Sequence, residues 1–374
     1  MKVKLGKYIQ EYSVRNKANE DIPVYSVTNT QGFCQDYFGK EVASKDKTTY
    51  KIVPRGYFAY NPSRINVGSV DWQRDEDQVI VSPLYNVFSV SPELNQQYLY
   101  YYLKSDFALH RIKAVATGSV RDNLKLEMLK NFPIRIPSVE EQEYIVQALD
   151  KAKNIINLRR NELHKLDDLI RARFVEMFVD KKYEKVNAGS IIKEMRNGVS
   201  PSTIGNHHEK VLTLSAITQG KFDDKEWKYG LFADRPSAEK RITEDSFYIC
   251  RGNGNKLLVG MGVYSLENRP DLVFPDTVIA ARIDKEQITL PYLGIMWQQP
   301  EIRKQIEAGA RTTNGTYKIN QKVISRIEIT CPPLNEQIKF SDFVAQIDKS
   351  KATVQKALDE TQLLFDSLMQ QYFG

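Results

Sequence analysis

The sequence predicts a mixed α+β fold, with two pseudo-symmetric α/β bodies separated by two long antiparallel coiled-coil helices. Two observations lead to this fold class. The chain repeats itself in order along its 374 residues, and each copy ends with a long segment free of glycine and proline. The length agrees with this organisation, because a chain of this size commonly holds two or three domains.

The repeat begins with the first residues of the chain. Residues 2–11 return as residues 185–194, with five of the ten positions identical. Further matches follow in the same order, and their offset grows from 183 to 198. Small insertions in surface loops produce such a drift, whereas chance matches would scatter. The long period indicates a duplicated domain, because solenoid repeats are only about 20–50 residues long.

Each body is expected to contain short strands and one helix. Apolar runs separated by Gly, Pro and Asn are typical of strands. Those runs are residues 24–27, 57–60, 79–81 and 84–88 in the first copy, and 212–214, 247–249 and 278–281 in the second. The helix of each body is expected over residues 98–109 and 291–308. The aromatic run of the first copy aligns with that of the second by placing Phe58 over Tyr248.

The two long helices are expected within residues 138–182 and 333–374. Both segments follow a proline, which is tolerated at the start of a helix, and both lack internal helix breakers. Apolar residues recur at alternating spacings of four and three from Ile145 to Met177 and from Phe340 to Tyr372. This period is that of a coiled-coil seam. Since neither helix could leave its seam in water, the two are expected to pack against each other in antiparallel fashion.

Charge is unevenly distributed along the chain. Residues 1–137 carry a net charge of +5 and residues 183–332 carry +3, whereas the helical segments carry 0 and −2. A basic excess confined to the bodies suits a polyanion partner, although an ordinary basic surface would have the same charge. No stretch approaches the roughly 20 apolar residues of a membrane span, and three unclustered cysteines fit a reducing cytoplasm.

Motifs of catalysis are missing from the sequence. It contains no phosphate-binding P-loop and no G-x-S-x-G nucleophile elbow. The four histidines have no metal-ligand spacing, and His207 with His208 fits a polar loop better than a phosphate contact. The run from Asn61 to Arg64 lacks the second proline and the aromatic residue of an amino-methyltransferase loop. These absences favour a binding protein over an enzyme.

Two matching segments carry a family resemblance. Each body ends in a short apolar run, a proline and a Glu-Gln pair that opens the following helix, at residues 134–142 and 329–337. Gly118-Ser119 and Gly315-Thr316 precede these runs. The doubled order of body and helix resembles the specificity subunit of type I restriction–modification systems. Ser138 stands where the second copy has Pro333, which suits a helix start because Ser is a good N-cap.

The resemblance implies a function and a set of partners. Residues 1–137 and 183–332 would be target recognition domains 1 and 2, each reading a few base pairs of double-stranded DNA. Residues 138–182 and 333–374 would be the spacer helices and the docking surface for two modification (methyltransferase) subunits. The chain itself would be non-catalytic and hold no cofactor. S-adenosylmethionine, ATP and Mg would bind the modification subunits and the restriction (helicase-nuclease) subunits.

Polar loops at matching places in the two copies are the candidate DNA contacts. Base edges are read by planar donors and acceptors, chiefly Arg, Lys, Asn and Gln. Loops 61–66 and 251–256 both lie between an aromatic strand and a Val-Gly pair, and they differ in sequence as two half-site readers would. A solvated turn is the alternative for each residue taken alone. The candidates are Lys45, Lys47, Asn61, Ser63, Arg64, Asn66, Arg74, Arg235, Arg251, Asn253, Asn255, Lys256, Arg269, Arg311, Thr312 and Asn314.

Two other functions remain open at this point. The duplicated bodies could bind proteins, with the coiled coil as a scaffold, and such a protein would show no affinity for duplex DNA at low salt. A self-contained nuclease or methyltransferase is disfavoured by the missing motifs.

Overall fold

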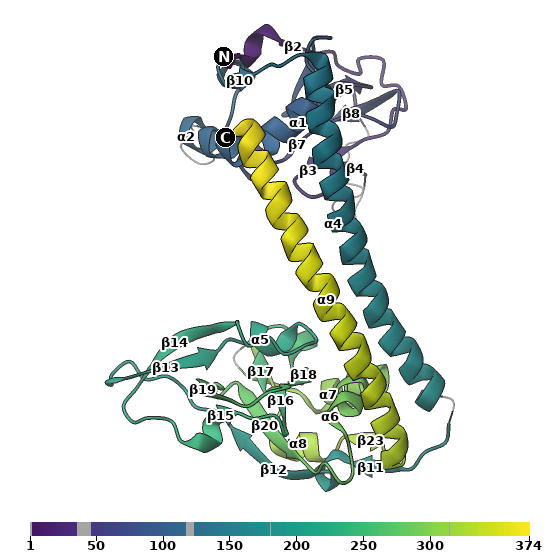
Figure 1. The fold of residues 1–374 in the computed structure, drawn as a ribbon, viewed down its shortest axis with the longest axis vertical. Helices are drawn as coiled ribbons and strands as arrows, with labels where there is room; N and C mark the ends of the chain where they lie inside the picture. The colour runs from purple at the N-terminus through teal and green to yellow at the C-terminus, as the bar shows by residue number, and fades with distance from the viewer. Residues whose placement is uncertain (1, 36–45, 117–122, 180, 314) are drawn as a thin grey trace. The chain divides into compact units, whose positions relative to one another are not determined.

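The computed structural model describes every residue except 1, 36–45, 117–122, 180 and 314. Its contacts divide the chain into two units (Figure 1). Unit 1 consists of residues 1–161 and 354–374, and unit 2 consists of residues 162–353. Each unit therefore contains one body of the repeat and a part of each long helix. The predicted mixed α+β class is confirmed.

Unit 1 begins with a small β-rich body. One four-stranded antiparallel sheet has the order β2-β9-β6-β7, and two-stranded pairs join β1 to β10, β3 to β4 and β5 to β8. Its strands are β1 (Lys2–Lys4), β2 (Ile9–Glu11), β3 (Ser26–Thr28), β4 (Gly32–Cys34), β5 (Lys51–Pro54), β6 (Phe58–Tyr60), β7 (Val70–Trp72), β8 (Gln78–Val81), β9 (Asn86–Val90) and β10 (Pro133–Arg135). Its short helices are η1 (Leu5–Lys7), η2 (Ile65–Val67), α1 (Gln96–Lys104), α2 (Asp106–Val115) and α3 (Leu126–Lys130).

The body of unit 2 repeats the main sheet of unit 1 and has two further sheets of four and three strands. Its main sheet has the order β12-β20-β16-β18, and further sheets have the orders β14-β13-β19-β15, β17-β22-β21 and β11-β23. The strands are β11 (Lys185–Asn187), β12 (Ile192–Asn197), β13 (His207–Leu212), β14 (Trp227–Phe232), β15 (Arg241–Ile242), β16 (Ser246–Cys250), β17 (Gly252–Asn253), β18 (Gly262–Tyr264), β19 (Arg269–Val273), β20 (Val278–Ile283), β21 (Arg311–Thr313), β22 (Thr316–Lys318) and β23 (Glu328–Thr330). The short helices are η4 (Ala188–Ser190), α5 (Ser215–Thr218), η5 (Ala238–Lys240), η6 (Lys256–Leu258), α6 (Leu290–Met296), α7 (Pro300–Gly309) and α8 (Gln321–Ser325).

Sheet register aligns the two copies more closely than the sequence does. The first strand of each main sheet pairs Ile9 with Val90 and Ile192 with Ile283. The neighbouring strand of each sheet continues this pairing, and it places Phe58 and Phe247 at equivalent positions. The sequence alignment of Phe58 with Tyr248 was therefore wrong by one residue. A shift of one residue in a strand exchanges the two faces of the sheet.

The helix expected near the end of each body is in fact two helices. In unit 1 the chain leaves helical geometry at Ser105, whose hydroxyl accepts a hydrogen bond from Ala108 N and caps α2. In unit 2 the break precedes Pro300, which occupies the first turn of α7. Both residues favour a new helix start rather than a continuous helix.

The predicted long helices are α4 (Val139–Phe174), followed by a π-helical turn η3 (Val175–Val179), and α9 (Leu334–Phe373). Ser138 Oγ accepts a hydrogen bond from Glu141 N and so caps α4. In unit 1 the start of α4 lies beside the end of α9, where Arg160 donates to Gln362 over 3.5 Å. In unit 2 the end of α4 lies beside the start of α9, where the rings of Phe174 and Phe340 are 5.7 Å apart. The two helices are therefore antiparallel.

Equivalent aromatic residues fasten the end of each long helix to a body. Phe373, at the end of α9, lies 5.1 Å from the ring of Tyr98 in unit 1. Phe178, just after α4, lies 4.9 Å from the ring of Tyr292 in unit 2. All four side chains are buried. Each body is thus packed against the start of one long helix and the end of the other.

A buried glutamine explains the Glu-Gln pair that opens each long helix. Gln142 accepts a hydrogen bond from Asn95 N and donates to the carbonyls of Glu93 and Pro137. Gln337 accepts from Thr289 N and donates to the carbonyls of Gln287 and Pro332. Both glutamines are fully buried. Buried polar groups without partners destabilise a fold, so these bonds fix the helix to the body.

Candidate nucleic-acid interface

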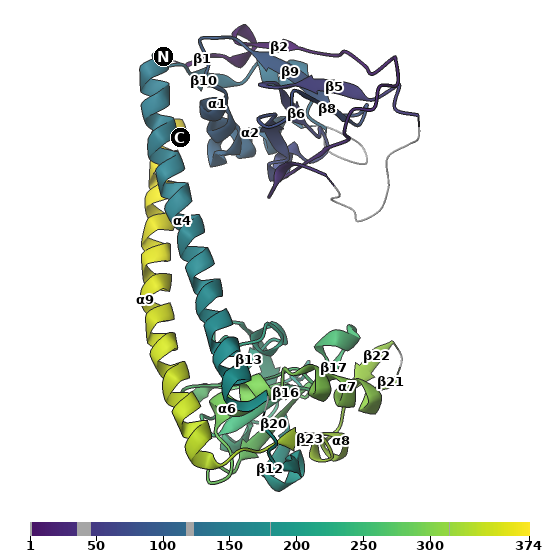
Figure 2. The ribbon, with the colours of Figure 1, turned by 90° about the vertical axis from the view of Figure 1, so that its right-hand side faces the viewer.

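Unit 2 brings two candidate segments together that lie about 60 residues apart in sequence. Strand β22 pairs with β17 on one side and with β21 on the other (Figure 2). Its register places Gly252 and Arg311 opposite Lys318, and Asn253 and Thr312 opposite Tyr317. Loop 251–256 and the segment that starts at Arg311 therefore form one polar surface.

Asparagines shape loop 251–256. Asn253 Oδ1 accepts a hydrogen bond from Asn255 N, and Asn255 Oδ1 accepts one from Leu257 N at the start of η6. Such local bonds are characteristic of Asn in turns. They use the amide oxygens and leave the side chains of Asn255 and Lys256 exposed to solvent. Arg251 is half-buried and donates to the carbonyl of Asp276.

Arg303 of α7 binds the end of this loop and the residues that follow it. Its guanidinium donates to the carbonyls of Lys256, Leu257 and Val259, at 3.3, 3.2 and 2.7 Å. An arginine offers several donors in a rigid plane, which suits it to fix one stretch of backbone. Sequence reasoning missed this positioning residue, because nothing in a helical stretch of sequence indicates which loop its side chains contact.

The matching loop of unit 1 is arranged in the same way. Leu124 N donates to Pro62 O, and Ser63 Oγ donates to Asn123 Oδ1, so loop 61–66 lies against the segment that follows α2. Asn61 Oδ1 accepts a bond from Ser63 N. Arg64 is exposed, and Asn66 is half-buried.

A glycine in left-handed geometry follows both loops. Gly68 has a φ of 88° and Gly260 a φ of 75°. Side chains rarely tolerate this conformation, which explains why the Val-Gly pair recurs in the two copies.

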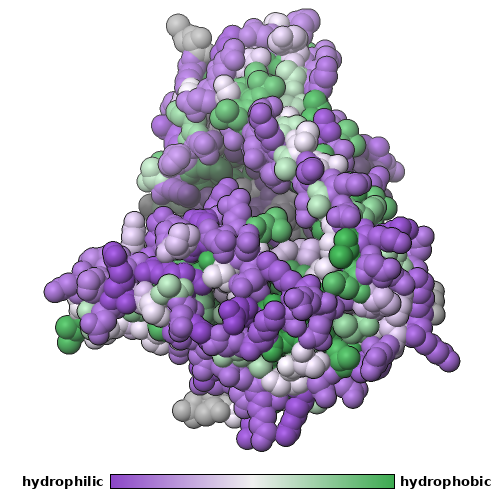
Figure 3. Space-filling model, turned by 60° about the horizontal axis from the view of Figure 1, so that its bottom comes forward, coloured by the Kyte–Doolittle hydropathy of each residue, from purple (hydrophilic) through white to green (hydrophobic). Residues whose placement is uncertain are grey.

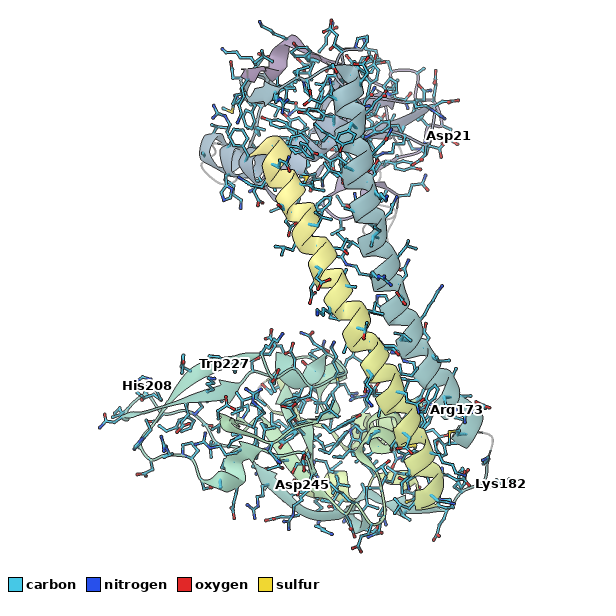
Figure 4. All side chains as sticks on the ribbon, in the orientation of Figure 1. Asp21, Arg173, Lys182, His208, Trp227 and Asp245 are labelled. Carbon is cyan, nitrogen blue, oxygen red and sulfur yellow. The ribbon has the colours of Figure 1, made fainter. Side chains whose placement is uncertain are left out.

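Four other candidates lie outside these two loops in the sequence and are ion-paired. Lys47 pairs with Asp21, which Figure 4 labels, and Arg74 pairs with Asp71. Arg235 pairs with Glu209, and Arg269 pairs with Asp224 and Asp271. Hydrogen bonds from Arg269 lower the pKa of Asp271 to about 2, so that carboxylate is charged under ordinary conditions. Lys45 and Asn314 lie outside the described residues.

The histidine pair lies in a strand rather than in a loop. His207 and His208 open β13, which pairs with β14, and Figure 4 labels His208 and Trp227 on this hairpin. Across the part of the chain that the structure describes, no three His, Cys, Asp or Glu side chains are grouped as metal ligands. None of the described helices combines the length and apolar character needed to cross a membrane.

The surface of unit 2 agrees with a polar partner. The face that Figure 3 shows is mainly hydrophilic, and its apolar residues form small, separate groups. Large exposed apolar patches mark apolar interaction sites, and this face has none among the described residues.

Comparisons with known proteins agree on one family. Residues 2–167 match the model of the type I restriction modification DNA specificity domain. The type I restriction enzyme EcoKI specificity subunit of Escherichia coli K12 is 23% identical over 293 residues, which cover 73% of this chain and 63% of that protein. The StySPI specificity subunit of Salmonella potsdam is 22% identical over 299 residues, which cover 74% of this chain and 64% of that protein. The chain thus spans less than two thirds of the length of either relative.

A solved structure agrees with the fold. The S subunit of a type I restriction-modification system from M. genitalium superposes with a TM-score of 0.56, over 100% of this chain and 96% of that one. Its sequence is 14% identical, so the likeness concerns the fold.

Proposed function

Because residues 2–167 match the type I restriction modification DNA specificity domain and the similar curated proteins are specificity subunits, we propose that the chain is the DNA-reading subunit of a type I restriction–modification complex. One observation carries the proposal. Two bodies with the same sheet order each present a polar loop at the same place, and the two loops differ in sequence. Two such readers suit a target made of two different half-sequences, as in other bipartite readers.

Each half of the repeat supplies one recognition domain and one spacer helix. Residues 1–137 and 183–332 are the two target recognition domains, and residues 138–182 and 333–374 hold them apart. The polar surface of loop 251–256 with Arg311 and Thr312 reads one half-site, and loop 61–66 reads the other. The chain transfers no methyl group and cuts no DNA. Those reactions, with S-adenosylmethionine, ATP and Mg, belong to modification and restriction subunits in the cytoplasm.

The long helices offer a docking surface for modification subunits. Leu158 of α4 and Leu363 and Leu364 of α9 are 67%, 72% and 54% exposed, and all three belong to unit 1. Apolar side chains of this size on the outer face of a helix pair suit a protein partner. Leu158→Asp and Leu363→Asp should each weaken capture of the modification subunit at least tenfold. Ser350→Asp, an exposed residue of α9 in unit 2, should leave capture unchanged.

Selection of duplexes from a random pool by the chain with its modification subunit tests the DNA proposal. We expect one motif of two short half-sequences separated by a gap of unspecified bases. Affinity should also fall steeply with salt, because phosphate contacts release counterions. Retention of duplexes without any sequence preference would contradict the proposal. Complete lack of duplex affinity at low salt would favour the protein scaffold instead.

A further inference from the structure

Three cations surround the ring of Tyr100 in unit 1. The centroid of this ring lies 5.4 Å from Arg74 Cζ, 5.5 Å from Lys104 Nζ and 5.2 Å from Lys153 Nζ. The cations come from the loop after β7, from the end of α1 and from α4. All four side chains are half-buried. We refer to Arg74, Tyr100, Lys104 and Lys153 as the Tyr100 cluster.

The carboxylates nearby form no ion pair with the two lysines among the described residues. Both oxygens of Asp71 bind the guanidinium of Arg74. Asp150 accepts hydrogen bonds from Tyr101 and Gln97. Among the described residues, neither lysine ammonium forms an ion pair. The Tyr100 cluster therefore holds two positive charges that no carboxylate pairs with.

The contacts of these lysines are with neutral groups. Lys104 Nζ donates to the carbonyls of Gly68 and Asn29. Lys153 Nζ lies over the rings of Tyr100 and Tyr101, whose faces attract a cation but carry no net charge.

The fold itself does not require a cation at this place, as unit 2 shows. Gly260, the counterpart of Gly68, has its carbonyl bound by the indole N–H of Trp297 over 2.7 Å. The Gly220 carbonyl accepts from the side-chain amide of Gln298, the counterpart of Lys104, over 3.4 Å. In the second copy, neutral side-chain donors therefore bind the backbone carbonyls at this place.

The other members of the cluster are also absent from unit 2. At the equivalent positions of the repeat, Leu266 replaces Arg74 and Gly294 replaces Tyr100. The offset of 195 residues that relates Gln142 to Gln337 and Phe178 to Phe373 makes Asp348 the counterpart of Lys153, and Asp348 lies 3.7 Å from Lys351. Among the described residues, unit 1 therefore has two lysines without ion pairs at this place, where unit 2 has Gln298 and Asp348.

Holding these charges in place is unfavourable for the free protein. Burial lowers the pKa of Lys104 to about 8, with Lys153 and Arg74 acting in the same direction and Asp71 against it. Burial also lowers the pKa of Lys153, with Arg74 acting in the same direction and Asp150 and Asp71 against it. Groups with such perturbed titration are typical of binding sites, where a ligand supplies the missing charge.

We propose that the Tyr100 cluster binds phosphate groups of the DNA backbone next to loop 61–66. The location selects this anion, because Lys104 binds the carbonyl of Gly68, which directly follows η2 at the end of that loop. Lysine and arginine beside a reading loop are the usual partners of backbone phosphates, which position a protein without reading sequence. The inference rests on the proposed function, and it makes unit 1 the more salt-sensitive reader.

The test uses the full chain, a labelled 30-base-pair duplex with the selected target, and an unrelated duplex of equal length. Lys104→Gln and Lys153→Gln remove one charge each, and Lys104→Gln keeps a side-chain donor as in Gln298. Each variant should lower affinity for both duplexes by a similar factor, about tenfold at low salt. Each should also reduce the slope of log affinity against log salt by about 1. The control variant Lys351→Gln, which removes an ion-paired lysine of α9 in unit 2, should leave the slope unchanged.

The outcomes separate the two proposals. If the wild-type chain binds no duplex, the proposed function fails. If it binds but both lysine variants keep the wild-type slope, or if only the selected target is affected, the phosphate assignment is wrong. ATP and inorganic phosphate serve as competing probes. The phosphate assignment to DNA would be overturned by two results together. ATP or inorganic phosphate would stabilise the wild-type chain against heat but not Lys104→Gln, and the variant would keep the wild-type salt slope with duplex DNA. The cluster would then be a site for a free phosphate. Thermal unfolding curves identify any variant that fails to fold.

Discussion

The two bodies share a framework but differ in the groups that hold their reading loops. In unit 1 a lysine ammonium binds the carbonyl of Gly68, and in unit 2 an indole and a guanidinium bind the backbone around Gly260. The sheet order and the buried glutamines are the same in both copies. Duplication has therefore kept the groups that build the body and exchanged the groups that support the loop.

The framework should respond equally to damage in either copy. Gln142→Ala and Gln337→Ala each remove three hydrogen bonds from a fully buried site and leave backbone groups unpaired. We expect each substitution to lower the free energy of unfolding by about 2–4 kcal/mol, measured by urea denaturation.

Exposed glutamines of the same helices supply the controls. Gln147→Ala in α4 and Gln346→Ala in α9 should change the unfolding free energy by less than about 0.5 kcal/mol. A large loss in one copy and none in the other would show that the two anchors are not equivalent.

The loop supports should respond differently. Arg303→Met removes the donors that bind the carbonyls of Lys256, Leu257 and Val259, and the counterpart of Arg303 in unit 1 is the apolar Leu109. We expect a loss of about 1–3 kcal/mol in binding to the selected target, confined to discrimination at one half-site. The measurement is competition binding with duplexes mutated in one half or in the other.

Leu109→Met is the matched control in unit 1, and it should preserve discrimination at both halves. Equal loss of discrimination at the two half-sites in Arg303→Met would contradict a separate support for each loop.

A smaller effect concerns pH and unit 1 alone. The Lys104 ammonium is charged below about pH 8 in the free protein. A phosphate bound beside it would stabilise the charged form, so that Lys104 keeps its proton at higher pH. DNA binding then takes up a proton, so affinity should fall as the pH rises from 7 to 9, by at most about tenfold per pH unit. Arg74, Lys153 and Asp71 face the same ammonium and set its titration.

The variant Lys104→Gln isolates this contribution. Its affinity should depend less on pH than that of the wild-type chain over the same range, measured by anisotropy at fixed ionic strength. Parallel pH profiles for the two proteins would show that Lys104 does not titrate on binding.

The long-range plan of the molecule was predictable because it rests on simple patterns. The absence of glycine and proline, with apolar residues at alternating spacings of four and three from Ile145 to Met177, predicted α4. A second apolar stripe of the same spacing predicted α9. The aromatic strand was aligned one residue out of register, since neighbouring aromatic residues look alike in sequence while hydrogen bonding distinguishes Phe247 from Tyr248.

The site was less predictable, because its contacts join distant residues. Pairing of Arg235 with Glu209 and of Arg269 with Asp224 connects positions 26 and 45 residues apart, and no local pattern signals either pair. The Glu-Gln pairs were found as motifs, but the buried role of Gln142 depends on a turn 49 residues upstream. Arg74 was the only member of the Tyr100 cluster among the predicted DNA contacts. Its two lysines were not predicted, because they come from two different helices.

The spacing of the two half-sites is the most direct test of a reader with two bodies on paired helices. Seven residues inserted after Asn161 of α4 and seven after Thr353 of α9 keep the apolar stripe in phase and lengthen each helix by about 10 Å. Selection from random duplexes should then return both half-sequences unchanged, with a gap longer by about three base pairs. An unchanged gap, or a change within either half-sequence, would contradict the spacer role of the helices.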